Sequence, residues 1–381
     1  MTGRRALLLT ASMGAGHDAC AQELARRLAD RADDAVVVDL LELLPARAGI
    51  ALRASYAVML TRAPWLYDVI YRRFLAAPPP ERLSSDPLVR LALPRVASLV
   101  ARLRPDAVVP LFHVAAQVTG ALRAQRRLTV PVTVVITEVV AHGLWVHPGN
   151  DRHVCLHDAV VGEVAAHGGR DPVEAAPLLR AEFRREPTSR ASLPVAPNRL
   201  PVLVTGGGWG AGDVTATARL LRASRSFAPV VLCGRNDRLR RRLQREPGVI
   251  AVGWQNDVRP LVDASAAVVQ NAAGLTFWEA LAARRPVVTY RPLPGHATAA
   301  AARLDALGLA AWARDGRLVA TLEQVTDSGA HPALPAATDP ADLVLFADVA
   351  GPPPGPNRSG HERTASIPRA AADDGPVAGG A

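Results

Sequence analysis

The stretch AAGLTFWEALAARRPVVTYRPLP, residues 272–294, passes from the end of an apolar strand into a turn, a helix, a second strand and a proline-bounded loop. Open α/β sheets bind ligands where strands end and helices begin, and the helix start after Gly274 offers N–H groups and a positive dipole to a phosphate. Glu279, five residues further on, can accept hydrogen bonds from ribose hydroxyls. We therefore expect a nucleotide here; the alternative is that Gly274 only eases the turn and Glu279 is a solvated helix residue.

The same alternation of apolar strands and helices runs through the chain and predicts parallel, doubly wound α/β sheets. Expected helices include 17–32 and 114–126, and strands are expected at 6–10, 35–40, 106–110, 130–137, 202–205, 229–233, 249–252, 266–269 and 286–290. A length of 381 residues also favours two domains, because single cores seldom grow so large.

The prolines of residues 184–200 mark a linker between two Rossmann-like domains, 1–183 and 201–317. After residue 317 the apolar pattern fades, and the end of the chain is rich in proline, glycine and alanine. We expect 318–381 to be mostly disordered, with a possible short helix at 339–349.

The charge and cysteine content narrow the function classes. All 44 basic residues are arginine, so the net charge of +9 reflects composition, and we expect no nucleic-acid partner. Cys20, Cys155 and Cys233 are scattered, which argues against a disulfide framework or a structural zinc site and fits a reducing cytoplasm. No apolar window is long enough to span a membrane, so any membrane contact is expected to be peripheral.

Two glycine loops follow expected strands. In the first, residues 12–17, Gly14 and Gly16 allow a substrate close to the backbone, and His17 suits a general base near neutral pH or, alternatively, a helix cap. The third glycine of a dinucleotide fingerprint is absent, which disfavours a nicotinamide cofactor. In the second loop, residues 205–213, Gly207 and Gly208 can fold around a diphosphate or permit domain closure; the missing P-loop lysine argues against an NTPase.

Residues 137–148 place Glu138, His142, Trp145 and His147 just past an apolar strand. Zinc is one interpretation, but the two histidines lack a convincing third ligand. Glu138 is a better candidate for a base or for a partner of His17. The alternative is that this cluster only braces a domain interface.

The segment 50–75 mixes aromatic residues with arginines, a composition typical of an interfacial membrane element facing anionic lipid. Residues 44–105 hold ten arginines against Asp68, Glu81 and Asp86. The alternative is a buried helix with an arginine-rich polar face. The candidate membrane residues are Tyr56, Arg62, Trp65, Tyr67, Tyr71, Arg72, Arg73 and Phe74.

Together these motifs resemble the monogalactosyldiacylglycerol synthase and diacylglycerol glucosyltransferase family, relatives of the lipid II-forming N-acetylglucosaminyltransferase. The resemblance covers roughly residues 5–312, through LLLTASMGAGH, VVITEVVAHGLWVHPGNDRHV, LVTGGGWG, VLCGRN, VGWQNDV and the opening stretch extended to Gly295-His296. It implies a GT-B fold with an amino-terminal acceptor domain at the inner face of the cell membrane. It also implies inverting, metal-independent transfer of a hexosyl group from a UDP-sugar to a lipid such as diacylglycerol, with no cofactor.

The resemblance assigns roles residue by residue. Gly16 and His17 would lie at the acceptor hydroxyl, and Glu279 would bind the ribose. The remaining matches are Gly274 and Thr276 near the phosphates, Gly234, Arg235, Asn236 and Trp254 around the base, and His142, Trp145 and His147 in the middle motif.

The chain departs from the family at three places. Glu138 replaces the usual aspartate, Ala272-Ala273-Gly274 stands where the family has a glycine pair, and His296-Ala297 stands where a Gln-Glu pair is expected to hold sugar hydroxyls. These departures leave glucose, galactose and N-acetylglucosamine open as donor sugars. Two alternatives also stay open: a glycosyltransferase for a soluble small-molecule acceptor, and a degenerate, non-catalytic protein that binds a nucleotide sugar or a membrane.

Overall fold

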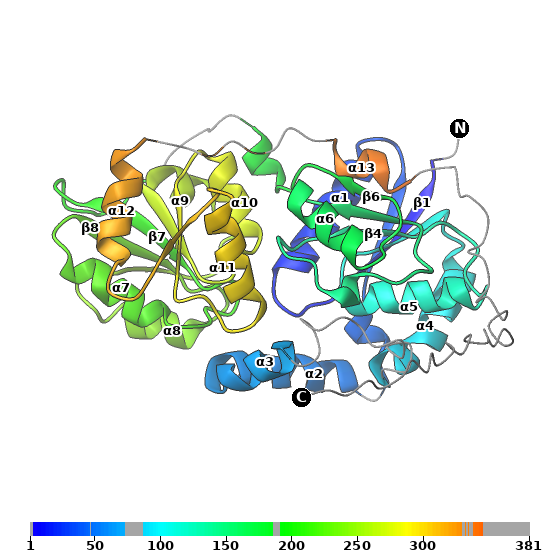
Figure 1. Ribbon diagram of the computed structural model, residues 1–381. Coiled ribbons are helices and arrows are strands. Elements are labelled where there is room, and N and C mark those ends of the chain that lie inside the picture. Colours follow the sequence, from blue (N-terminus) through cyan, green and yellow to red (C-terminus); the bar gives the residue numbers. More distant parts are fainter. Residues whose placement is uncertain are drawn as a thin grey trace, which may run out of the picture.

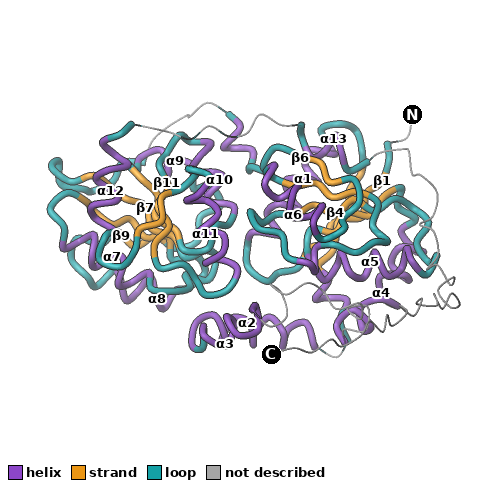
Figure 2. Tube along the Cα trace, in the orientation of Figure 1, coloured by secondary structure: helices purple, strands orange, loops and turns teal. Residues whose placement is uncertain are grey.

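Two parallel sheets organise the chain into two α/β lobes (Figure 1), and helices cover the faces of both sheets (Figure 2). The computed structural model describes residues 3–45, 47–72, 87–185, 191–329, 332, 334 and 338–345. The α/β fold expected from the alternating pattern is confirmed.

In the described residues of the first lobe, strands β2-β1-β3 continue into β4-β5-β6 through a bridge between Val108 and Val132. The strands are β1 Arg5–Thr10, β2 Asp34–Asp39, β3 Ala107–Pro110, β4 Thr133–Ile136, β5 Arg152–Cys155 and β6 Pro172–Glu174. Around them lie α1 Gly16–Ala29, η1 Leu40–Leu43, α2 Ala48–Arg62, α3 Pro64–Ile70, α4 Pro87–Leu103, α5 His113–Ala124, η4 Gly143–Trp145, α6 Asp158–Ala166 and η5 Ala181–Arg184. Leu7, Leu8 and Leu9 have no exposed surface, as expected for a parallel strand covered on both faces.

In the described residues of the second lobe, the strand order is β12-β11-β10-β7-β8-β9. The strands are β7 Leu200–Thr205, β8 Phe227–Leu232, β9 Ile250–Val252, β10 Ala267–Gln270, β11 Val287–Tyr290 and β12 Ala311–Ala313. Its helices are α7 Val214–Ala223, α8 Asp237–Leu243, α9 Arg259–Ala264, α10 Leu275–Ala282, α11 His296–Ala306 and α12 Leu318–Asp327. Helix α12 corrects the domain boundary expected at residue 317, because Leu318 and Leu322 are buried in the core of this lobe.

The strand orders fix where ligand loops meet. In the first sheet the order reverses between β1 and β3, and in the second between β7 and β10. Loops that follow strands at such switch points form the ligand crevices of open α/β sheets. The loops after β1 and β3 lead into α1 and α5, and those after β7 and β10 lead into α7 and α10.

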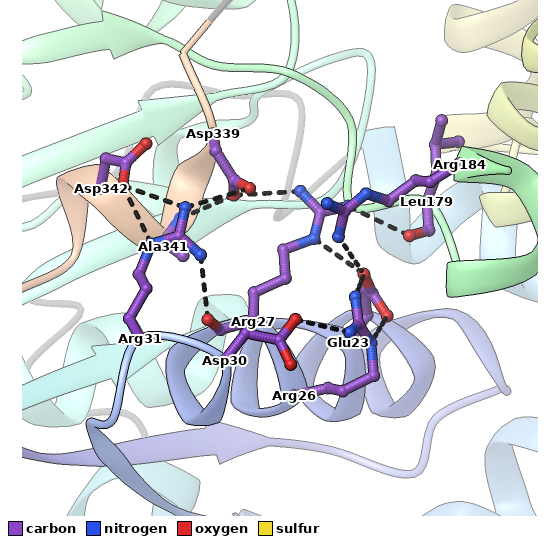
Figure 3. A network of polar contacts seen from close by, with 10 residues as sticks. All are labelled: Glu23, Arg26, Arg27, Asp30, Arg31, Leu179, Arg184, Asp339, Ala341 and Asp342. Atoms are coloured by element: carbon purple, nitrogen blue, oxygen red, sulfur yellow. Dashed lines mark hydrogen bonds and ion pairs between the residues drawn. The ribbon is translucent and has the colours of Figure 1, made fainter.

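A buried polar network holds α1 against the segments that join the lobes (Figure 3). The Arg27 side chain is 3% exposed; it donates to Glu23 at 2.8 Å, to Asp339 at 3.0 Å and to the Leu179 carbonyl at 3.0 Å. Leu179 lies just before the chain leaves the first lobe, and Asp339 caps α13, Pro340–Leu343, after it has returned. Helix α13 falls within the expected 339–349. Helix α1, which carries His17 in its first turn, is therefore fixed to both segments that join the lobes.

Candidate active site

His17 lies in the first turn of α1, and its hydrogen bonds set its tautomer. The Nδ1 atom lies 2.9 Å from the carbonyl oxygen of Leu111 and 3.0 Å from the Thr137 hydroxyl. A carbonyl can only accept, so Nδ1 carries the hydrogen and Nε2 keeps its lone pair. Burial lowers the pKa of His17 below 6.5, although the Glu138 carboxylate opposes this shift. The ring is therefore a neutral base at neutral pH.

Glu138 lies in a group of aromatic and histidine side chains. The Trp145 indole donates to its Oε2 at 3.2 Å, and His142 Nε2 is 3.9 Å from the same oxygen. Burial alone would raise the pKa of Glu138, but the nearby histidines, His296 foremost and then His142 and His17, lower it to about 2. Burial lowers the pKa of His142 to about 4. At neutral pH Glu138 is therefore a carboxylate, and the His142 ring is neutral like that of His17.

His113 belongs to this group and was missed in the sequence. It begins α5, and its ring lies 5.0 Å from His142 and 5.9 Å from Trp145. Burial lowers the pKa of His113 well below 6.5, and its Nδ1 has no hydrogen-bond partner among the described residues. Its position in the chain could have identified it as a candidate site residue, because His113 follows β3 at the switch point of the first sheet.

The two glycine loops face each other between the lobes. A Cβ atom on Gly208 would lie 3.1 Å from the Ala15 side chain, whereas Gly14 and Gly16 border open space. Gly207 has a φ of +70°, a backbone conformation that favours glycine. The expected loops of the two halves therefore do come together.

Residues 233–236 pack against the second glycine loop. The Arg235 N–H donates to the Gly208 carbonyl at 2.8 Å, and a Cβ on Gly234 would lie 2.4 Å from the same oxygen. The Arg235 guanidinium lies 4.2 Å from the Trp254 ring centre. The Asn236 side chain makes two hydrogen bonds within the protein: its Oδ1 accepts from Leu239 N at 2.9 Å, and its Nδ2 donates to the Trp209 carbonyl at 3.2 Å. Asn236 therefore caps α8, and its role as a base contact stays a prediction.

Helix α10 starts at an open site. Gly274 is its exposed N-cap, with no atom within 4 Å of an added Cβ, and Thr276 is half-buried in the first turn. Ala273 adopts a φ of +49°, although it replaces a glycine of the resembling family. The side chain of Gln270 accepts from the N–H groups of Ala272 and Ala273. The N–H groups at the helix start, rather than those of the turn, are thus placed for an anion.

Glu279 is in neither of the two environments expected for it. It has no exposed surface, and its two carboxylate oxygens accept from Arg180 Nε at 2.5 Å and Nη2 at 2.7 Å. A solvated helix residue is therefore ruled out, and a free ribose acceptor is not what the structure contains. Arg180 comes from the first lobe, next to η5, and also donates to the Asn256 carbonyl at 3.1 Å. Ribose binding by Glu279 requires Arg180 to release it.

Comparison with known proteins agrees with this geometry. Residues 17–174 match the family model described as monogalactosyldiacylglycerol (MGDG) synthase. A processive diacylglycerol β-glucosyltransferase of Bacillus cereus is 25% identical over 324 residues, covering 82% of each chain, and one of Bacillus thuringiensis is 24% identical over the same length. The chain is a glycosyltransferase. The resemblance expected from the motifs is confirmed.

Solved structures identify the fold as GT-B. The MurG structure from Acinetobacter baumannii aligns with a TM-score of 0.55 at 17% identity, covering 90% of this chain and 99% of MurG. The spinosyn rhamnosyltransferase SpnG, solved with thymidine diphosphate, aligns with a TM-score of 0.53 at 15% identity, covering 90% of this chain and 98% of SpnG. The glycosyltransferase therefore has the two facing Rossmann-like domains expected of it.

His147 lies apart from the active site of the glycosyltransferase. Its Nδ1 accepts from Gly149 N at 3.0 Å, and a Cβ on Gly120 would lie 2.3 Å from its ring. Burial alone lowers the pKa of His147 to about 4. His147 thus packs against α5, and its acceptor role stays a prediction.

The aromatic residues expected at the membrane also need correction. Tyr67 and Tyr71 are 8% and 7% exposed, and the Tyr56 ring lies 5.9 Å from Trp209 of the second lobe. These tyrosines therefore face the junction of the lobes, below which α2 and α3 lie (Figure 1). Trp65 is 67% exposed, and Arg62 and Arg72 are exposed too. The candidates Arg73 and Phe74 lie outside the described residues.

The described residues contain neither a membrane-spanning helix nor a cluster of metal ligands. No helix in the described ranges is long and apolar enough to cross a membrane. No three His, Cys, Asp or Glu side chains there are grouped to hold a metal ion.

Proposed function

We propose that this glycosyltransferase moves a hexosyl group from a UDP-sugar to a lipid acceptor such as diacylglycerol, with inversion and without a metal. The observation that carries the proposal is the neutral His17 base beside Glu138, opposite the second lobe's glycine loop. The names of the Bacillus relatives support a diacylglycerol acceptor. The open start of α10 supports a diphosphate leaving group.

The proposed transfer can be written so that every proton and electron pair is accounted for by the acceptor, the donor sugar and the protein side chains. His17 Nε2 takes the proton of the acceptor hydroxyl while its oxygen bonds to the anomeric carbon. The bond from that carbon to the diphosphate oxygen breaks on the opposite face, and UDP leaves with the electron pair. Glu138, a carboxylate at neutral pH, stabilises the imidazolium that forms on His17. The N–H groups at the start of α10 stabilise the charge that develops on UDP.

The outer face of α2 and α3 supports contact with an anionic membrane at its cytoplasmic side. Large apolar side chains are exposed there: Ile50 at 69%, Val58 at 51%, Trp65 at 67%, Leu66 at 39% and Val69 at 54%. Arg62 and Arg72 flank them. Apolar residues at headgroup depth with arginines beside them suit an interfacial element.

One experiment tests transfer. UDP release is measured with UDP-glucose, UDP-galactose and UDP-N-acetylglucosamine, each with diacylglycerol in anionic vesicles and each with a soluble glycoside. Product anomers are read by NMR, and EDTA is added in a parallel series. UDP release with diacylglycerol, an inverted product and insensitivity to EDTA are expected. Release with the soluble acceptor alone would favour the soluble-acceptor alternative, and no release with any donor would overturn the transferase proposal.

A second experiment tests the membrane face. We expect Trp65→Ser/Val69→Ser to reduce sedimentation with anionic vesicles. The matched control is Leu220→Ser, which changes an apolar residue that is 40% exposed on α7 of the second lobe. Equal vesicle binding by wild type and the double variant would remove α3 from the membrane contact.

A further inference from the structure

Helix α3 of the first lobe holds the turn before α11 of the second lobe. The N–H of Gly295 donates to Asp68 Oδ1 at 3.1 Å. The other carboxylate oxygen of Asp68 pairs with Arg72 Nε at 2.9 Å. The two oxygens therefore have separate partners. Asp68 and Gly295 are 227 residues apart in sequence, so their hydrogen bond joins the two lobes.

The turn at Gly295 is fitted to the tyrosines beside Asp68. Gly295 has a φ of +78°, and a Cβ there would lie 2.9 Å from Tyr67 Cε1 and 3.0 Å from Tyr71 Cβ. Both tyrosines are buried. The backbone of the second lobe thus approaches α3 as closely as a residue without a side chain allows.

The next residue in the chain, His296, is the first of α11. Among the histidines that lower the pKa of Glu138 His296 is the foremost, and it also acts on the pKa of His17 and of His113. A shift of the Gly295 turn therefore moves the neighbouring His296, which acts on Glu138 and, under the proposed function, lies on the side of the donor sugar.

We propose that Asp68 is a positioning residue for this reaction: by accepting the Gly295 N–H, it sets where His296 stands relative to Glu138. The proposal rests on the proposed function only in treating His296 as a donor-side group. Asp68 lies on α3 between the exposed Trp65 and Val69. The helix that presents the apolar outer face therefore also fixes one side of the active site.

The test separates the hydrogen bond from the charge. Asp68→Asn keeps an oxygen that can accept from Gly295 N, whereas Asp68→Ala removes it. Asp305→Ala is the matched control, because Asp305 also accepts a backbone N–H, that of Trp312 at 2.9 Å, but on an exposed site elsewhere in the second lobe. The variants are combined with His296→Ala and measured for kcat and KM by UDP release.

We expect Asp68→Ala to lower kcat/KM about 10- to 100-fold, as small misplacements in active sites do. Asp68→Asn and Asp305→Ala should stay within about threefold of wild type, well below that range. In the His296→Ala background, Asp68→Ala should have no further effect. Equal losses for Asp68→Asn and Asp68→Ala, or additive losses with His296→Ala, would overturn the proposal.

A second readout does not depend on activity. The ring resonance of His296 in NMR spectra, assigned by its loss in His296→Ala, should shift in Asp68→Ala and stay in place in Asp68→Asn. If wild type releases no UDP from any donor, the proposed function fails while this shift still supports the positioning role. An unmoved resonance in Asp68→Ala overturns the positioning role whatever the activity.

Discussion

The ion pair between Arg180 and Glu279 joins the two lobes, and replacing Arg180 with alanine is expected to destabilise the protein strongly. Two hydrogen bonds of 2.5 and 2.7 Å link the side chains, and Glu279 has no exposed surface. Removing one partner of a buried pair costs about 3–5 kcal/mol, because the other charge stays buried. The Arg180 side chain is 22% exposed, so we expect the lower end, about 3 kcal/mol.

The pH dependence of this loss gives a second signature. Burial raises the pKa of Glu279 even with Arg180 in place, and Glu182 adds to this shift. Without Arg180 the pKa of Glu279 rises further, so the folded state binds its proton more readily than the unfolded state does. Stability of Arg180→Ala then falls as pH rises through that pKa, and the deficit should be larger at pH 8 than at pH 5.

Urea unfolding followed by tryptophan fluorescence measures both effects. A cycle with Arg180→Ala, Glu279→Gln and the double variant isolates the pair, and the double variant should recover much of the loss. Losses in the two single variants that are additive and below about 1 kcal/mol, the range of exposed ion pairs, would refute the expected cost of breaking a buried pair.

We also expect UDP to bind Arg180→Ala more tightly than wild type, because the ribose and the Arg180 guanidinium compete for the same two oxygens of Glu279. Unchanged UDP affinity would remove Glu279 from the ribose role.

Three further predictions concern single residues. His17→Ala should lower kcat by about 100-fold or more, the range of general bases, and wild-type kcat/KM should stay level as pH falls to 6.5 because burial lowers the pKa of His17. The folded-state pKa of His142, about 4, lies below its unfolded value of 6.5, so its stability contribution is complete above pH 6.5. As pH falls from there toward 4, unfolding experiments should show a loss of stability that is smaller by about 1.4 kcal/mol per pH unit in His142→Phe, while the other buried histidines still contribute. Arg27→Ala leaves Glu23 paired with Arg26 but removes the hydrogen bonds to Asp339 and the Leu179 carbonyl, so it should cost about 1–3 kcal/mol in urea unfolding, whereas exposed Arg95→Ala should have little effect.

The strands could be predicted where their apolar runs were continuous. The expected 6–10 and 202–205 lie inside β1 and β7, but β5, with the sequence RHVC, has two polar residues of four and was missed. Helix α12 was missed because its apolar residues are spread over one face, and only its packing against the second sheet shows that face to be core.

The helix pair α2 and α3 shows why composition misassigned a surface. Tyrosines beside arginines are compatible with a lipid interface and equally with a packed domain junction. Tyr67 faces inward because it meets Gly295, and Tyr56 because it meets Trp209. Those partners come from the distant second half of the chain, so local sequence could not separate the exposed Trp65 from the buried tyrosines.

Two departures from the resembling family acquire a joint meaning in three dimensions. Glu138 replaces an aspartate and His296 replaces the first residue of a Gln-Glu pair, and they are far apart in sequence. In the structure His296 is the foremost of the histidines that lower the pKa of Glu138. A carboxylate longer by one methylene also reaches further from its backbone. The two changes therefore bear on one electrostatic interaction, and the donor side of this site is better described by that pair than by either residue alone.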